Sequence, residues 1–195
     1  MRNQTKTMIR KALMDRLNKE PLSKITVRAL CEDCGINHNT FYYYYADIYA
    51  IIQEYFQENM EHVKAAYDET ASWEKSFLVA AQPALDNKVA LDHIYHSIRK
   101  EDLENYIYSV SGDIMIRFVN SIYPQLDARQ EDRLLIAHFF RCALTSIVLH
   151  WIDGGMKEKP EYIINRIGFL MDGSIEEALR RSADEKKKIE KNSDK

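Results

Sequence analysis

The chain has 195 residues, 46% hydrophobic and 29% charged, which is the balance of a globular protein with one or two small helical domains. Three cysteines are too few and too odd in number for a secreted disulfide scaffold, and charges frequent from Arg2 onward leave no visible signal peptide. No apolar run reaches the roughly 18–20 residues of a membrane span. We therefore expect a cytoplasmic protein with no membrane partner.

The net charge of −3 conceals an asymmetry along the chain. Residues 1–30 hold eight Lys or Arg and two acidic residues, a balance of +6, so the remaining residues carry −9. A basic amino-terminal arm on an acidic body fits a polyanion at one end. The alternative is a charged, solvated helix with no such partner.

Residues 3–18 have an apolar stripe at helical spacing and predict an amphipathic helix, which Pro21 ends. A second helix is expected after Thr26, a good N-cap, and Gly35 suits the left-handed conformation that ends it. Asn37 can cap a third helix, which runs to about Tyr44. Asp47 can cap the next helix.

The short helix after Asn37 has two different sides. Phe41 and Tyr45 are four residues apart and are expected in the core. The opposite side is rich in hydrogen-bonding groups and poor in charge: His38, Asn39, Thr40, Tyr42 and Tyr43. Such a helix suits the major groove of DNA.

Residues 25–52 resemble the DNA-binding domain of the TetR family of bacterial transcriptional regulators. The family pattern is roughly T-x-x-x-[IL]-A-x-x-A-G-V-S-x-x-T-[LF]-Y-x-[YH]-F. Ten positions match it in chemistry and phase: Thr26, Leu30, Gly35, Ile36, Asn37, Thr40, Phe41, Tyr42, Tyr44 and Tyr45. Cys31 and Cys34 occupy the two small, alanine-like positions.

The resemblance implies an all-α fold of about nine helices. A three-helix helix-turn-helix domain would occupy residues 1–56, a larger helical effector-binding and dimerisation domain residues 57–182, and a charged tail residues 183–195. The family usually has Lys or Arg just inside the helix after the motif. Here Ala46, Ile48 and Tyr49 surround Asp47, and no Lys or Arg is present.

The rest of the chain also shows helical periodicity. The helix capped by Asp47 is expected to run to about Tyr67, and further helices are expected at 72–83, 89–98, 103–123, 131–153 and 160–181. Residues 131–153 are apolar almost all the way round, so a partner surface must cover that helix. By the resemblance, the last two helices form a four-helix dimer interface. Residues 183–195 are expected to be a frayed helix or disordered.

For DNA contact, Arg28 can reach a guanine edge and Asn39 an adenine edge. The resemblance and the helix starts make Thr26, Asn37, Tyr42 and Tyr44 candidate phosphate contacts. The complete candidate set is Thr26, Arg28, Asn37, His38, Asn39, Thr40, Tyr42, Tyr43 and Tyr44. Any one of them can instead be a surface side chain without a contact.

Two sets of residues in the body are weaker candidates. An effector pocket can be lined by Phe77, Tyr95, Tyr106, Met115, Phe118, His138 and Cys142, although plain core packing explains each of them as well. The dimer interface is expected to include Phe140, Leu144, Ile147, Val148, Trp151, Ile163, Ile167, Leu170 and Met171.

Metal and catalytic sites are not expected. Cys31, Cys34 and His38 lack the fourth ligand of a structural zinc site, and His93 and His96 lack a third ligand. No Gly-rich phosphate loop, H-E-x-x-H or nucleophile elbow is present. We expect no catalytic residues and no cofactor. A ligand-binding enzyme of helical type is a remote third interpretation.

The leading interpretation is a homodimeric regulator that binds a palindromic operator on double-stranded DNA. Such regulators are most often repressors in the family, and a small-molecule effector of unknown identity would release this one from the operator. The alternative is a co-activator or adaptor of the same fold. It would bind a metabolite or protein partner and would not bind an operator by itself. The missing Lys or Arg beside Asp47 motivates this second interpretation.

Overall fold

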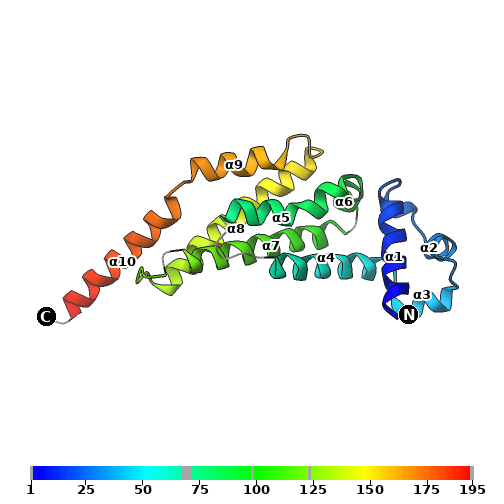
Figure 1. Cartoon of the computed structure of the whole chain (residues 1–195), viewed down its shortest axis with the longest axis horizontal. Helices are drawn as coiled ribbons and strands as arrows, with labels where there is room; N and C mark the ends of the chain where they lie inside the picture. Colours follow the sequence, from blue (N-terminus) through cyan, green and yellow to red (C-terminus); the bar gives the residue numbers. More distant parts are fainter. Residues whose placement is uncertain (1, 67–71, 98, 123, 194–195) are drawn as a thin grey trace. The chain divides into compact units, whose positions relative to one another are not determined.

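The structure is a computed structural model that describes residues 2–66, 72–97, 99–122 and 124–193. These residues form helices and one 3-10 turn, with no strand among them, which confirms the all-α class (Figure 1). The helices are α1 (Arg2–Leu17), α2 (Val27–Cys34), α3 (His38–Tyr44), α4 (Ile48–Ala65), α5 (Trp73–Asp86), α6 (Lys88–Tyr95), α7 (Lys100–Ser121), α8 (Gln130–Asp153), α9 (Pro160–Leu170) and α10 (Ser174–Ser193).

The described chain groups into two compact units that do not follow sequence order. The first unit comprises Met1–His62, Gln82–Tyr106 and Leu149–Met156, and the second comprises Val63–Ala81, Ile107–Val148 and Lys157–Lys195. Several helices therefore contribute to both units. The domain boundaries at residues 56 and 182 stay a prediction.

In the first unit, α1 contacts both α2 and α6. The apolar stripe of α1 is buried through Ile9, Leu13 and Leu17, each at most 1% exposed. Polar contacts join α1 to α6, because the ring Nδ1 of His93 lies 2.7 Å from the carbonyl oxygen of Leu17. The Asn18 side chain also accepts from the backbone N–H of Ala90 at 3.3 Å.

In the second unit, a buried arginine joins α8 to the end of α7. Arg133 is 7% exposed and donates to the carbonyl oxygens of Val119 at 2.7 Å and Leu126 at 2.9 Å. Hydrogen bonds to carbonyls make the burial of a guanidinium tolerable. The apolar core around it includes Ile114 and Met115 of α7.

The last predicted helix is divided into two. α9 ends at Leu170 and α10 begins at Ser174, with Gly173 between them at a φ of 71°. Only glycine takes that left-handed conformation freely, so the chain changes direction there. This division explains why there are ten α-helices rather than about nine among the described residues.

Residues 183–193, which were expected to be a frayed helix or disordered, continue α10 as a helix to Ser193. Its first half is held by the start of α8: the Ser182 hydroxyl accepts from the backbone N–H of Arg129 at 3.0 Å and donates to Asp132 at 2.5 Å. Lys186 pairs with Asp127 at 2.6 Å. These contacts hold as a helix a segment whose composition leaves a frayed helix and disorder both open. Residues 194 and 195 lie outside the described residues.

A second difference concerns Pro83, which was expected to end its helix. α5 continues through Pro83 to Asp86. A proline inside a helix removes one backbone hydrogen bond but does not always stop the helix. The predicted limits at residues 67, 98 and 123 fall outside the described residues.

Candidate nucleic-acid interface

The helix-turn-helix is held by the caps that the sequence predicts. The Thr26 hydroxyl accepts from the N–H of Ala29 at 3.2 Å and begins α2. Gly35 ends α2 at a φ of 61°. The Asn37 side chain accepts from the N–H of Thr40 at 2.8 Å and begins α3. The Asp47 side chain accepts from the N–H of Ala50 at 2.8 Å at the start of α4.

The two sides of α3 have opposite environments. Phe41 is 0% exposed and Tyr45, directly after the helix, is 3% exposed, so this side packs into the first unit. Tyr42 is 56% and Tyr43 is 69% exposed. His38 and Asn39 are also exposed, so α3 presents an imidazole, an amide and two phenol rings to solvent.

The remaining candidate DNA contacts have other partners within the chain. Thr26 and Asn37 use side-chain oxygens as caps, and the Thr40 hydroxyl lies 3.1 Å from the Asn37 side-chain oxygen. Arg28 is exposed on α2 and its Nε donates to Glu32 at 2.9 Å, one turn away. Tyr44 is half-buried, with its ring 5.0 Å from the ring of Tyr43 in an edge-on arrangement.

The charge near this motif differs from the sequence expectation. Residues 1–62 hold eight Lys or Arg and eight Asp or Glu, so the basic arm is balanced within the same segment. The structure brings opposite charges together: Lys6 and Arg10 pair with Glu54, Arg16 with Glu20 and Asp33, and Arg28 with Glu32. Among the described side chains, Lys11, Lys19 and Lys24 are in no ion pair.

The two cysteines of α2 lie toward the interior. Cys31 is buried, and Cys34 places its Sγ 3.7 Å from the carbonyl oxygen of Met8. Burial raises the pKa of both thiols. Among the described residues no cluster of His, Cys, Asp and Glu has the arrangement of a metal site. Core packing accounts for Cys31, whereas Cys34 is half-buried.

The candidate effector residues are spread over both units. Phe77, Met115, Phe118, His138 and Cys142 belong to the second unit, and Tyr95 and Tyr106 to the first. Phe77, Tyr95 and Met115 are buried, and the Tyr106 ring stacks on Phe56 with centroids 4.9 Å apart. His138 and Cys142 are exposed on α8, with Nε2 and Sγ 3.6 Å apart. Their role as a pocket stays a prediction.

The candidate interface residues also differ in exposure. Leu144 and Trp151 are buried within the chain, Leu170 and Met171 are exposed, and the others are half-buried: Phe140, Ile147, Val148, Ile163 and Ile167. Sequence reasoning missed five other exposed apolar side chains of the same helices. These are 48–71% exposed: Leu134, Leu135, Phe139, Tyr162 and Phe169. Helical spacing from Leu135 to Phe139 was a signal that could have found them.

One described helix, Gln130–Asp153, is long and apolar enough to cross a membrane by length and composition alone. Its most apolar window has a mean hydropathy of 1.5 and is 33% buried. This corrects the expectation that no segment reaches that length. The evidence for a span is weak, since core helices of soluble proteins meet the same criterion.

The chain matches a family model and solved structures. Residues 71–173 match a TetR family model described as the C-terminal region of a transcriptional regulator. The solved structure of the dihydroxyacetone kinase operon activator DhaS is similar with a TM-score of 0.74, over 88% of this chain and 96% of that one, at 16% identity. At that identity the similarity shows the fold alone. No curated protein sequence matches the chain.

Proposed function

This chain belongs to the TetR family of transcriptional regulators, and from that premise we propose that it is a homodimer that binds a palindromic operator. The observation that carries the proposal is the exposed side of α3, where His38, Asn39, Tyr42 and Tyr43 face solvent. We further propose that it acts in the cytoplasm as a repressor, released from DNA by a small-molecule effector.

The chemistry of α3 fits base-edge contact better than phosphate contact. An exposed amide such as Asn39 can bond both edge groups of adenine, and tyrosine rings can contact thymine methyl groups. α2 adds Arg28, which is 81% exposed and can leave Glu32 to bond a guanine. Pairing between exposed charges one helical turn apart contributes only about 0.3–0.5 kcal/mol, so this exchange costs little.

The apolar surface of the second unit supports the dimer. Leu135 and Phe139 are more than 60% exposed on α8, and Tyr162 and Phe169 are at least 70% exposed on α9. Soluble monomers rarely leave large apolar side chains exposed in such groups. A second copy that covers these helices would remove the surface from water. It would also present two α3 helices to two half-sites.

Effector release requires that the effector bind one dimer conformation more tightly than the other. Membership of the TetR family supports effector release. The sign of control is a separate choice, since DhaS carries the word activator in its name. Transcription from the adjacent promoter, compared with and without the gene, tests repression directly: higher transcription without the gene is expected.

The experiment that tests DNA binding is footprinting on the intergenic DNA upstream of the gene, followed by titration of the protected duplex. The double variant His38→Ala, Tyr42→Ala is expected to weaken operator binding at least tenfold with an unchanged helical signal. His62→Ala, which removes an exposed histidine on α4, is the control and should bind as the wild type does. Equal operator affinity for all three proteins would exclude α3 as the recognition element.

A second candidate is the adaptor that binds no operator alone. Two observations favour it. The charges of residues 1–62 are balanced, and no Lys or Arg stands beside Asp47. Salt dependence separates the two functions, because each phosphate that a cation contacts adds about 0.9 to the slope of log K against log salt. A regulator should show a steep negative slope on its promoter, and an adaptor should show no binding there.

A further inference from the structure

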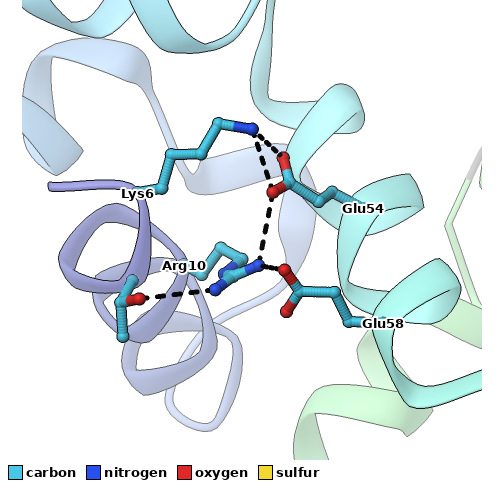
Figure 2. A network of polar contacts seen from close by, with 5 residues as sticks. Lys6, Arg10, Glu54 and Glu58 are labelled. Atoms are coloured by element: carbon cyan, nitrogen blue, oxygen red, sulfur yellow. Dashed lines mark hydrogen bonds and ion pairs between the residues drawn. The ribbon is translucent and has the colours of Figure 1, made fainter. Parts of the chain in front are cut away.

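Four charged side chains join α1 to α4, and we call them the α1–α4 ion cluster: Lys6, Arg10, Glu54 and Glu58. Figure 2 shows the Lys6 ammonium against both carboxylate oxygens of Glu54, at 2.9 and 3.0 Å. The Arg10 guanidinium lies 3.3 Å from Glu54 and also contacts Glu58. Two cations thus meet two carboxylates one helical turn apart.

The cluster lies beside the end of α3. The Lys6 ammonium is 5.2 Å from the centroid of the Tyr45 ring, and Tyr45 directly follows α3. Lys6 is 31% and Arg10 is 17% exposed at the side chain, so both still reach solvent. Without their carboxylate partners, these cations would add two positive charges beside the end of α3.

An ion pair changes what a cation contributes to DNA binding. A free lysine or arginine that contacts a phosphate releases a condensed counterion and strengthens binding at low salt for any sequence. Unlike the exposed pair of Arg28 and Glu32, Lys6 and Arg10 are held by the partly buried Glu54 and must first break that contact, so most of the gain is lost. Arg10 has two carboxylate partners and Lys6 is held at both oxygens of one.

We propose that Glu54 and Glu58 neutralise Lys6 and Arg10 and thereby suppress non-specific attraction to DNA, so that binding depends on the base-edge contacts of α2 and α3. Glu54 and Glu58 are then specificity determinants that need not touch DNA themselves. The inference rests on the proposed function in one respect, that α3 faces the duplex.

The test is the double variant Glu54→Gln, Glu58→Gln, titrated with a random-sequence duplex between 50 and 200 mM salt. Two released cations should steepen the slope of log K against log salt by about 2 and raise affinity at 0.1 M salt roughly tenfold or more. The control is Glu101→Gln, Glu161→Gln, which removes the same charge from two exposed carboxylates that are in no ion pair among the described residues. It should keep the wild-type slope.

The complementary variant is Lys6→Gln, Arg10→Gln. Because these cations are already neutralised in the wild type, their removal should leave the slope unchanged, and the quadruple variant should return to the wild-type slope. A Lys6→Gln, Arg10→Gln slope that is flatter by about 2 would show that both cations already contact phosphates and would overturn the proposal. If the glutamine variant of Glu54 and Glu58 loses its helical signal, this second comparison decides alone.

The outcomes also separate this inference from operator binding. If the wild type binds the operator and Glu54→Gln, Glu58→Gln leaves the slope unchanged, the cluster's proposed role is refuted and the proposed regulator function stands. If the wild type binds no operator but the variant shows a steeper slope on random DNA, the cluster's proposed role is supported and the proposed regulator function is refuted.

Discussion

The guanidinium of Arg16 binds both carboxylate oxygens of Asp33, with Nη2 to Oδ1 at 2.9 Å and Nε to Oδ2 at 2.5 Å. This two-point contact joins α1 to α2, the first helix of the helix-turn-helix. The hydrogen bonds from Arg16 lower the pKa of Asp33 below its usual value. The position of α2 against α1 should therefore depend on pH.

The first prediction follows from the sign of that shift. A carboxyl whose pKa is lowered by folding stabilises the folded state above its unfolded pKa of about 3.9, and this stabilisation is lost as pH falls through the lower folded pKa. Asp33→Asn should cost less than about 1 kcal/mol near pH 7, since the pair is partly exposed. The difference in urea unfolding free energy from wild type should shrink toward pH 2.

A matched control for this prediction is Glu32→Gln, the neighbouring acid, whose partner Arg28 lies on the same helix. It joins no two helices, so its cost should be only about 0.3–0.5 kcal/mol. A difference between Asp33→Asn and wild type that stays constant from pH 7 to pH 2 would contradict the assigned role of Asp33.

The second prediction concerns Gly35, the residue that ends α2 at a φ of 61°. A Cβ added there would meet nothing within 4 Å, so a substitution costs backbone strain alone. Gly35→Ala should destabilise the fold by about 1–2 kcal/mol. Gly35→Asn should cost less, because asparagine tolerates the left-handed conformation. Thermal unfolding checks the order, and equal melting temperatures for the two variants would refute it.

The third prediction concerns a close approach between α5 and α9. A Cβ at Gly168 would lie 2.2 Å from the Glu74 carboxylate and 2.8 Å from its Cγ, so the glutamate would have to move. Gly168→Ala should therefore destabilise the wild type by about 1 kcal/mol or more. In a Glu74→Ala background the clash is absent, and the same change should stabilise α9 by up to about 1 kcal/mol. Identical effects in both backgrounds would rule out this steric contact.

Local signals predicted the helix-turn-helix well. Capping depends on a residue and its neighbours three positions away, so Thr26, Gly35 and Asn37 could be assigned from the sequence alone. The pairing of Arg16 with Asp33 and of Lys6 with Glu54 could not, because these residues are distant in sequence. The amino-terminal arm therefore looked strongly basic, although Lys6, Arg10 and Arg16 pair with carboxylates in the fold.

The apolar helix α8 shows the opposite limit. Its hydrophobic positions surround the axis, so periodicity predicts a covered helix but does not say which side its own chain covers. The structure buries Leu144 and leaves Phe139 67% exposed. The limits of α10 were likewise missed, because its order depends on distant partners such as Asp132.

The last prediction uses this exposed side of α8. Phe139→Glu places a charge in the proposed interface and should convert a dimer to a monomer in light scattering at micromolar concentration, with an unchanged helical signal. Val79→Glu, on another exposed apolar side chain of the second unit, is the control and should stay dimeric. Leu144→Ala should instead cost about 2–5 kcal/mol of folding free energy, since its side chain is buried.

Cys142 gives an independent measure of the same interface. It is exposed on α8 three residues after Phe139, whereas Cys31 is buried and burial raises the pKa of its thiol. Covering by a second copy should protect Cys142 from a thiol reagent in the wild type, and Phe139→Glu should make it react faster while Cys31 stays unreactive. A wild-type monomer, or a Cys142 that reacts equally fast in both proteins, would show that α8 is not where two copies meet.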